Sequence, residues 1–400
     1  MLLIVPTCDG EDIGEAWVAY QWVRYLRERN DLTVLTYHKQ GRPPASSQFP
    51  GLRVIEWAEP AGLGRAERFN SMLKPGYVPF YSRARRWIRD AQAGGERFDV
   101  AFQPVPVAMR YPSPVAGLGI PYIIGPVGGS LQSPPAFAEA DRSAPWFTHL
   151  RRLDRVRMHR DPWLRRTYAQ ASCVLGIAPY VKDFLAGTPV QRFEVMSETG
   201  LDELPRPVDR HGRDGDVRAL FVGRLVPTKG ARDAIRGLAL AGELPVVLDI
   251  VGDGFDRAAA TDLAAELGVG HRVRFHGRLP RQDVEDFYRT ADLFVFPSYR
   301  EPGGNVVFEA MGNGLPVITS DIGGPGNVVD DTCGFRLHPQ TPQQYGRDIA
   351  DALARLVTEP EFRLRLGEGA RQRVADIGLW SSRARQVEAI SAQVLARPPR

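Results

Sequence analysis

The sequence predicts an α/β protein made of two doubly wound, Rossmann-like domains. Short apolar runs rich in β-branched residues alternate with segments of helical periodicity, which is typical of parallel sheets covered by helices. This alternation stops at a polar, turn-rich segment over residues 204–216 and then starts again. The length of 400 residues is too great for one hydrophobic core and suits two domains.

The first half of the chain supplies seven expected strands. Apolar runs predict them at residues 2–5, 32–37, 53–57, 99–103, 122–125, 173–178 and 193–197. Helical patterns follow several of these runs, for example at 15–28 and 82–91. We therefore expect residues 1–203 to form the N-terminal Rossmann-like domain, followed by a linker over 204–216.

The second half repeats the pattern over residues 217–378, the expected C-terminal domain. Strands are predicted at 219–222, 246–251, 273–275, 293–296, 317–319 and 334–337. Helices are predicted at 231–241, 257–267, 282–290, 305–312 and 342–357. A last helix is expected within 379–400, and one alternative is that it returns to the N-terminal domain. Ligands of such sheets bind at the carboxyl ends of the strands, so we expect the site in a cleft between the domains.

Composition excludes several classes of protein. Hydrophobic residues make up 43% and charged residues 24%, as in an ordinary globular chain. The three cysteines are far apart and the seven histidines form no metal-binding motif, so no disulfide framework and no metal site is predicted. The first five residues are too short for a secretory signal, and no apolar stretch approaches the length of about 20 residues that spans a bilayer. We expect a cytoplasmic location.

Two glutamates follow the strand predicted at 293–296. Glu301 lies in the loop after the strand, and Glu309 lies about a turn inside the next helix. Between them, Gly303 and Gly304 leave backbone amides exposed at the start of that helix, which favours anion binding. Glutamates at such positions accept hydrogen bonds from sugar or ribose hydroxyls. The alternative is a pair of solvated helix residues, but the diglycine favours a functional site.

Two cations follow the first strand of the second half. Arg224 and Lys229 flank a strand-to-helix turn, and a diphosphate needs two such positive partners. The alternative is a pair of exposed surface charges. Against it, Lys229 is one of only four lysines in a chain whose 51 basic residues are otherwise arginines, so a compact ammonium is favoured here.

Together these patterns resemble the retaining glycosyltransferases of family 4, which have the GT-B fold. The resemblance covers about 120 residues of the C-terminal domain in the order of the family. The matching segments are Gly223-Arg224-Leu225 with Lys229-Gly230, Gly252-Asp253-Gly254, Phe275-His276-Gly277, Ala291-Asp292-Leu293 with Pro297-Ser298, Glu301 with Glu309, and Gly314-Leu315-Pro316-Val317 with Gly323-Gly324.

This resemblance implies a role for each matched residue. Glu301 would contact the donor sugar as the catalytic residue, Glu309 would bind the ribose, and Arg224 with Lys229 would bind the diphosphate. The donor-binding set that it implies is Arg224, Lys229, Glu309, Gly303, Gly304, Asn305, Val306, Gly14, Gly223, Arg278 and Leu279. No metal or other cofactor would be needed, and the substrate would be a nucleotide-sugar, with UDP- or GDP-sugars as the leading donors. The hexosyl transfer would retain anomeric configuration.

The N-terminal half, the expected acceptor domain, matches the family less well. Gly14 opens a helix after the first strand and can offer its amide to the diphosphate, and Glu15 is a weak candidate for orienting the acceptor. A first-turn glutamate that favours the helix dipole is an equal alternative. Many family members have a histidine after a middle strand, whereas residues 123–130 contain none here. The N-terminal catalytic contribution therefore stays open.

Two other motifs are weaker. Asp214-Gly215-Asp216 resembles a metal-binding DxD motif, but it lies in the polar linker and is interpreted as a solvated turn. Gly252-Asp253-Gly254 could begin a dinucleotide fingerprint, but the third glycine is missing.

A basic stretch runs from Trp146 to Arg166. Eight arginines occur between Arg142 and Arg166, interleaved with apolar residues, of which Leu150, Leu153 and Val156 keep helical spacing. One interpretation is an amphipathic helix packed on its own domain. The other is a peripheral contact with an anionic membrane at its inner face, or with a lipid-diphosphate acceptor. No motif supports nucleic-acid binding.

The leading functional prediction is a glycosyltransferase of surface polysaccharide or glycolipid synthesis. The second is glycosylation of a small soluble acceptor, such as a natural product or a sugar phosphate. Hypotheses of other classes are a non-catalytic nucleotide-sugar binder and a dinucleotide-dependent oxidoreductase. The oxidoreductase would need a complete glycine fingerprint, which the chain lacks. The donor sugar, its base and the acceptor stay open.

Overall fold

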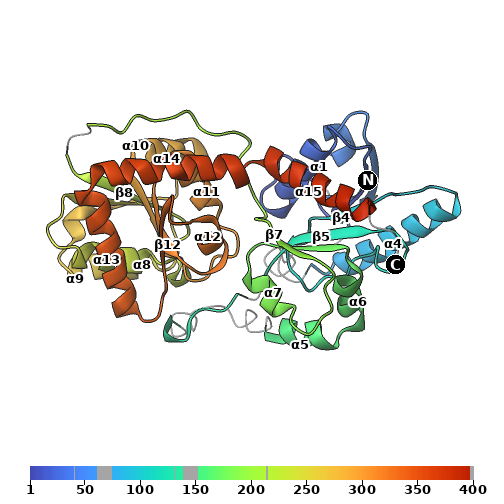
Figure 1. Cartoon of the computed structure of the whole chain (residues 1–400), viewed down its shortest axis with the longest axis horizontal. Helices are drawn as coiled ribbons and strands as arrows, with labels where there is room; N and C mark the ends of the chain where they lie inside the picture. The colour runs from blue at the N-terminus through green and yellow to red at the C-terminus, as the bar shows by residue number, and fades with distance from the viewer. Residues whose placement is uncertain (40, 61–73, 130, 138–151, 213–214, 397–400) are drawn as a thin grey trace. The chain divides into compact units, whose positions relative to one another are not determined.

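The structure is a computed structural model of the chain (Figure 1). It describes residues 1–39, 41–60, 74–129, 131–137, 152–212 and 215–396, and of residues 152, 153 and 155 it describes the backbone only. The chain divides into two compact units. Unit 1 comprises Met1–Ser130, His149–Glu198 and Arg383–Arg400, and unit 2 comprises Leu131–Thr148 and Thr199–Ser382. Each unit is described by itself.

Unit 1 contains a seven-stranded sheet in which every strand pairs in parallel, in the order β3-β2-β1-β4-β5-β6-β7. Its strands are β1 (Leu2–Ile4), β2 (Thr33–His38), β3 (Arg53–Ala58), β4 (Ala101–Gln103), β5 (Tyr122–Val127), β6 (Cys173–Gly176) and β7 (Phe193–Val195). The order reverses direction at β1, which has β2 on one side and β4 on the other. The carboxyl ends of β1 and β4 therefore flank the switch point at which ligands of doubly wound sheets bind.

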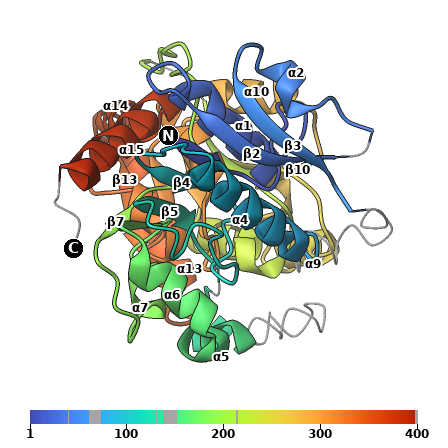
Figure 2. The same ribbon diagram turned by 90° about the vertical axis from the view of Figure 1, so that its right-hand side faces the viewer.

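Helices cover both faces of this sheet. The helices of unit 1 are α1 (Glu15–Leu26), α2 (Ala45–Gln48), α4 (Tyr77–Ala93), α5 (Arg152–Arg160), α6 (Pro162–Gln170), α7 (Tyr180–Phe184) and most of α15 (Trp380–Leu395). Helices α1 and α15 lie on one face, and α4, α6 and α7 lie on the other (Figure 2). Helix α4 shows why: Tyr77, Phe80, Ala84 and Ile88 follow helical spacing and are all buried.

Unit 2 contains a six-stranded parallel sheet in the order β10-β9-β8-β11-β12-β13. Its strands are β8 (Val217–Val222), β9 (Val246–Val251), β10 (Val273–Gly277), β11 (Leu293–Phe296), β12 (Val317–Ser320) and β13 (Gly334–Leu337). Strand β9 buries all six of its residues, as expected of a central strand covered on both faces. Here the order reverses at β8, so the carboxyl ends of β8 and β11 flank the switch point.

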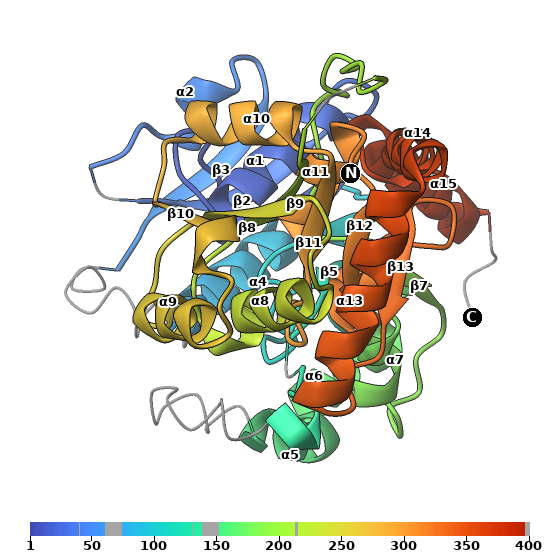
Figure 3. The same cartoon turned by 90° about the vertical axis from the view of Figure 1, so that its left-hand side faces the viewer.

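The helices of unit 2 also form two layers. They are η4 (Pro227–Lys229), α8 (Ala231–Leu240), α9 (Arg257–Glu266), η5 (Gly270–Arg272), α10 (Arg281–Thr290), α11 (Asn305–Gly312), α12 (Gly323–Val328), α13 (Pro342–Thr358) and α14 (Pro360–Ile377). Helices α8, α9 and α13 cover one face, and α10, α11 and α14 cover the other (Figure 3). Helices α8 and α13 pack closely because Gly237 has no Cβ, which would overlap Ile349.

The predicted α/β class, with two parallel sheets and helices on both faces, is confirmed. The predicted strands agree with the observed ones to within one or two residues at most ends. Helices α2, α5, α6, α7, α12 and α14 were not predicted as separate elements. Among the residues that the structure describes, no helix is long and apolar enough to cross a membrane.

Candidate functional site

The turn after β8 is the first part of the site in unit 2. Gly223 follows the strand, Arg224 is exposed, and Lys229 ends the short helix η4. Gly230 then caps α8 in the left-handed region, with φ 81°. A Cβ at this position would overlap the carbonyl oxygen of Pro297, so glycine allows the turn to lie against the end of β11. The sequence thereby brings Lys229 to the loop that contains Glu301.

The loop after β11 is the second part. Gly304 has φ 86° and caps α11, so Glu301, Gly303 and Gly304 all precede the helix. The Gly324 amide donates to the Glu301 carbonyl oxygen at 3.0 Å. A Cβ at Gly324 would overlap the Gly303 carbonyl oxygen, so the loop is pressed against the start of α12. This contact fixes the backbone from which the Glu301 side chain projects.

Lys229 and Glu301 form an ion pair, although 72 positions separate them in the sequence. The Lys229 Nζ contacts Glu301 Oε2, and the other carboxylate oxygen accepts a hydrogen bond from the Gly303 amide at 3.3 Å. The two side chains are only 14% and 15% exposed. Lys229 also lies 5.8 Å from the centre of the Phe296 ring. The structure therefore brings together Lys229, which was predicted to bind a diphosphate, and Glu301, which was predicted to be the catalytic residue.

Electrostatics make Lys229 unusual. Burial lowers its pKa to about 7, and the positive charges of Arg224 and Arg300 act in the same direction. The Glu301 carboxylate opposes them by favouring the charged ammonium. A second anionic group that reached Lys229 would therefore find a cation that is poorly solvated and close to other positive charges.

Buried hydroxyl groups hold the two loops together, and sequence reasoning missed them. Ser298 Oγ donates to the Thr228 carbonyl oxygen at 2.9 Å, and Ser320 Oγ donates to the Ser298 carbonyl oxygen at 2.6 Å. Both serines are fully buried. Thr228 directly precedes Lys229. These hydrogen bonds therefore connect β12 and the end of β11 to the backbone next to Lys229. The only available signal was Ser298 within the Pro297-Ser298 motif.

Glu309 lies about a turn inside α11, as predicted. Tyr288 Oη, from α10, donates to Glu309 Oε2 at 2.9 Å. Burial, together with the charge of Glu309, raises the pKa of Tyr288, so the phenol remains a proton donor. At the start of the same helix, Asn305 is exposed and its side chain bonds to Thr199, while Val306 is half-buried.

Arg278 and Leu279 follow β10 at the same carboxyl edge of the sheet. Arg278 is exposed and Leu279 is half-buried. The turn before them is tied to the neighbouring strand, because the Gly252 amide donates to the Gly277 carbonyl oxygen at 2.8 Å. In the strand order, β10 is two strands away from β8, whereas β11 is next to β8. The residues predicted to contact the base thus lie on the opposite side of the β8 turn from Glu301.

The predicted residues of unit 1 lie at its switch point. Gly14, with φ 66°, caps α1 and is exposed. Glu15 forms an ion pair with Lys74 and accepts a hydrogen bond from the Val107 amide at 3.3 Å. Val107 follows β4 and Glu15 follows β1, so the two strand ends converge on this carboxylate. The sequence did not indicate Lys74 as its partner.

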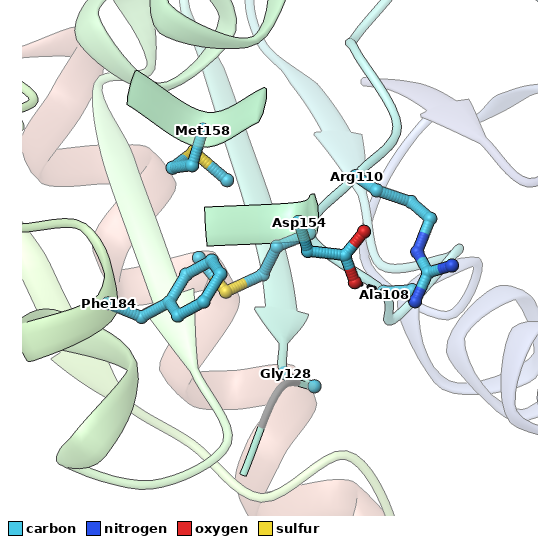
Figure 4. A pocket seen from close by; sticks show the side chains of 8 residues that line it. Ala108, Arg110, Gly128, Asp154, Met158 and Phe184 are labelled. Carbon is cyan, nitrogen blue, oxygen red and sulfur yellow. Dashed lines mark ion pairs between the residues drawn. The ribbon is translucent and has the colours of Figure 1, made fainter. Parts of the chain in front are cut away.

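A small pocket lies farther along the carboxyl edge of unit 1 (Figure 4). Its lining residues are Ala108, Met109, Arg110, Gly128, Gly129, Asp154, Met158 and Phe184, and its empty volume is about 230 Å³, part of it open to solvent. Arg110 Nη2 pairs with Asp154 Oδ2 at 2.8 Å. A Cβ at Gly128 would overlap Ile177. The absence of a Cβ at Gly128 therefore allows the close packing after β5.

Of the two weaker motifs, one precedes β8 and the other follows β9. Asp214 lies outside the described residues, and Asp216 is exposed just before β8. Gly252 has φ 139°, and a Cβ there would overlap the Gly223 carbonyl oxygen, which gives the Gly252 turn a packing role. Within the described parts of the chain, no group of three or more His, Cys, Asp or Glu residues is placed to hold a metal ion.

Several solved structures share this fold. The chain superposes on the sucrose-phosphate synthase of Thermosynechococcus elongatus with a TM-score of 0.64 at 19% identity, over 99% of this chain and 98% of the other. A lipopolysaccharide outer core galactosyltransferase gives a TM-score of 0.65 at 14% identity, over 98% and 99%. An Anabaena protein solved in complex with UDP and glucose gives 0.60 at 16%, over 98% of each chain. The fold is the GT-B fold of glycosyltransferases, as the resemblance predicted.

Sequence comparison adds a family match within unit 2. Residues 209–373 match the family model described as glycosyl transferases group 1. The D-inositol 3-phosphate glycosyltransferase of Frankia alni is 35% identical over 227 residues, which is 53% of this chain and 51% of that protein. The corresponding protein of Streptomyces griseus is 33% identical over 41% and 36%. The chain thus spans about half the length, or less, of these curated relatives. The family match contains Lys229, Glu301 and Glu309, but not Glu15.

Proposed function

We propose that the chain is a retaining glycosyltransferase of family 4 that transfers a hexosyl group from a nucleotide-diphosphate donor to an acceptor hydroxyl. One observation carries the proposal: Lys229 and Glu301, on different loops, meet at the switch point of unit 2. They lie within the region that matches the group 1 family model. A cation beside a carboxylate at this place suits a ligand that joins a diphosphate to a polyhydroxylated ring.

In this proposal different loops of unit 2 bind different parts of the donor. Arg224 and Lys229 neutralise the diphosphate, and the amides around Gly303 and Gly304 at the start of α11 donate to its oxygens. Glu309 binds the ribose, with its carboxylate oriented by Tyr288. The backbone near Arg278 and Leu279 contacts the base. The donor is a UDP- or GDP-sugar, and the Anabaena neighbour was solved with UDP.

Charge development explains how these residues would lower the barrier. The bond between the anomeric carbon and the phosphate oxygen breaks, and positive charge grows on the sugar ring while negative charge grows on the diphosphate. Lys229 and Arg224 stabilise the leaving diphosphate, and the Glu301 carboxylate stabilises the sugar. The acceptor oxygen forms the new bond on the same face, and its proton passes to the leaving phosphate oxygen. Side chains and amides replace a metal in this arrangement, so activity is expected to survive EDTA.

The acceptor is the open part of the proposal, with two candidates. Glycolipid or surface polysaccharide synthesis is the leading candidate from the sequence. The second, a small soluble acceptor, is favoured by the relatives named for D-inositol 3-phosphate. In both cases we assign acceptor binding to unit 1, where Glu15 and the Arg110 pocket lie along one carboxyl edge.

A nucleotide screen followed by donor hydrolysis tests the proposal. Thermal shift is measured with UDP, GDP, ADP and TDP and, for comparison, with NAD, and hydrolysis of sugar donors is then measured with the base that stabilises best. We expect one diphosphate to stabilise the chain and its sugar donors to be hydrolysed in the presence of EDTA. Stabilisation without hydrolysis or transfer would favour a non-catalytic binder. Stabilisation by NAD but by no diphosphate would favour an oxidoreductase and overturn the proposal.

A further inference from the structure

One surface of unit 1 combines exposed apolar side chains with arginines. Helices α5 and α6 lie side by side (Figure 2). Of their side chains, Trp163 is 68% exposed and Val156 is 47% exposed. We call this surface the α5–α6 face. The exposed side chains described between residues 156 and 166 are Val156, Arg157, His159, Arg160, Pro162, Trp163, Arg165 and Arg166.

Trp163 lies in the first turn of α6 and its side chain is exposed. Asp161 caps the helix, because its carboxylate accepts hydrogen bonds from the Trp163 and Leu164 amides at 3.0 and 3.3 Å. Pro162 occupies the first turn and fixes the direction of the helix. Leu164 and Tyr168 are fully buried, so the apolar side of α6 is already occupied by the core of unit 1. The indole is thus an additional apolar group that is open to solvent.

The charge of this face is positive because its acidic groups are already engaged. The Asp161 carboxylate caps α6 and also pairs with Arg157 at 3.0 Å. Asp154 pairs with Arg110 at the pocket. Arg160 and Arg165 are exposed, and Arg165 uses one nitrogen to reach the His159 carbonyl oxygen at 3.1 Å. The face therefore offers arginines around an indole, which suits anionic head groups beside an apolar layer.

The α5–α6 face lies close to the carboxyl edge of the sheet of unit 1. Helix α6 precedes β6 and crosses back along the sheet, so it begins near the carboxyl edge of unit 1. Helix α5 supplies Asp154 and Met158 to the pocket at that same edge. A surface that contacted α5 and the start of α6 would therefore lie beside the edge at which unit 1 binds ligands.

We propose that unit 1 docks on a bilayer containing anionic lipids through the α5–α6 face. Trp163 and Val156 enter the head-group region, and the arginines contact lipid phosphates. A lipid surface is favoured over nucleic acid, because an exposed valine beside the indole gains from an apolar layer and has no comparable partner on a phosphate backbone. This docking does not depend on the glycosyltransferase assignment.

Co-sedimentation of the full chain with vesicles tests the docking. Vesicles of phosphatidylcholine are compared with vesicles that also contain phosphatidylglycerol, at low and high salt. We expect binding to the anionic vesicles, weakened by salt, and little binding to phosphatidylcholine alone. Binding that is equal to both kinds of vesicle, or absent from both, would overturn the proposal.

Two variants locate the contact. Arg160→Glu with Arg165→Glu should lower the partition coefficient more than tenfold, since each arginine near an anionic surface contributes about fivefold. Trp163→Ser should lower it severalfold at high salt as well as at low salt. Arg157 is left unchanged because it pairs with the cap of α6.

Matched controls and a competitor complete the experiment. Leu240→Ser and Arg281→Glu change exposed side chains of unit 2 and should leave vesicle binding unchanged. Thermal melting of each variant shows that it is folded. If these controls lower binding as much as the α5–α6 variants, the face is not the contact. If a DNA duplex binds the chain while the vesicles do not, the basic face is a nucleic-acid surface and the proposal fails.

Discussion

At the scale of single residues, Lys229 combines a buried position with a carboxylate partner. We predict that Lys229→Ala weakens binding of the preferred nucleoside diphosphate by about 2 kcal/mol, because a charge-assisted contact is lost. Isothermal titration calorimetry measures the change. Arg232→Ala, at a half-buried side chain of the adjoining helix α8, serves as a control that removes a cation from the same region. If the Lys229 variant binds the diphosphate as tightly as the parent, Lys229 does not contact it.

Substitutions of Glu301 and Glu309 should affect different steady-state kinetic constants. Glu301→Gln is expected to lower kcat by about a hundredfold with little change in donor KM, because the lost contact strengthens only as charge develops on the sugar. Glu309→Gln is expected to raise the donor KM, since a ribose contact is equal in ground and transition states. Effects confined to KM in both variants would mean that neither carboxylate contacts the reacting sugar.

Residue types and spacing could single out candidate side chains in unit 2, but not the partners of those side chains. The diglycine before α11 pointed to Glu301, and the rarity of lysine pointed to Lys229. That these two groups touch depends on the order of β8 and β11 in the sheet, which local spacing does not encode. Tyr288 was missed for the same reason, because its hydroxyl reaches Glu309 from a different helix.

At the scale of elements, the Ser298 hydrogen bond aligns the turn containing Lys229 with β11. Ser298→Ala leaves the Thr228 carbonyl oxygen without this donor, so we predict a loss of about 1–3 kcal/mol of unfolding free energy. We also expect a raised donor KM, because Lys229 loses its support. Urea denaturation and donor titration measure the two effects. Ser82→Ala, which removes an exposed hydroxyl from α4, should change neither. An unchanged KM with the expected loss of stability would leave Ser298 a purely structural role.

The regular elements were predictable because their local signals agree with their final environments. Strands such as β9 are apolar runs bounded by turns, and they are buried on both faces in the structure. Helices α5 and α6 were harder to delimit. The spacing of Leu150, Leu153 and Val156 suggested one apolar side, yet Val156 is exposed and the break at Asp161-Pro162 divides the segment into two helices. Leu150 lies outside the described residues, as does the first part of the stretch that begins at Trp146.

At the scale of the whole molecule, most of the last helix, α15, belongs to unit 1, as does the N-terminal segment of the chain. Arg383, at the point where α15 enters unit 1, is only 2% exposed and interacts electrostatically with Glu198. Burial raises the pKa of Glu198 to about 7, and the charge of Glu15 adds to this, while Arg383 and Lys74 oppose it. The sequence could not reveal this cluster, because its members come from four separate segments.

We predict that Arg383→Met destabilises the chain, and more so at pH 8 than at pH 6. Without the cation, the pKa of Glu198 rises further above its unfolded value, so the folded state holds its proton to a higher pH. Stability then falls more steeply as pH rises, and the deficit should reach about 3 kcal/mol at pH 8. Chemical denaturation at both pH values measures it. Arg385→Met, two residues along the same helix, is the control. A deficit that is equal at both pH values would mean that Glu198 does not sense Arg383.

The ion pair of Lys229 with Glu301 also sets an order of events. In the proposed reaction both groups have other partners, so an arriving diphosphate must exchange places with the carboxylate that Lys229 already holds. Glu301 becomes available to the sugar only after that exchange, and the enzyme assembles its catalytic carboxylate in response to its substrate. Glu301→Gln should therefore bind the free nucleoside diphosphate severalfold more tightly than the parent, because a neutral amide competes less for the ammonium. With the sugar donor this gain is offset by the lost contact to the ring. Calorimetry with both ligands distinguishes the cases, and unchanged affinity for the free diphosphate would show that the exchange costs nothing.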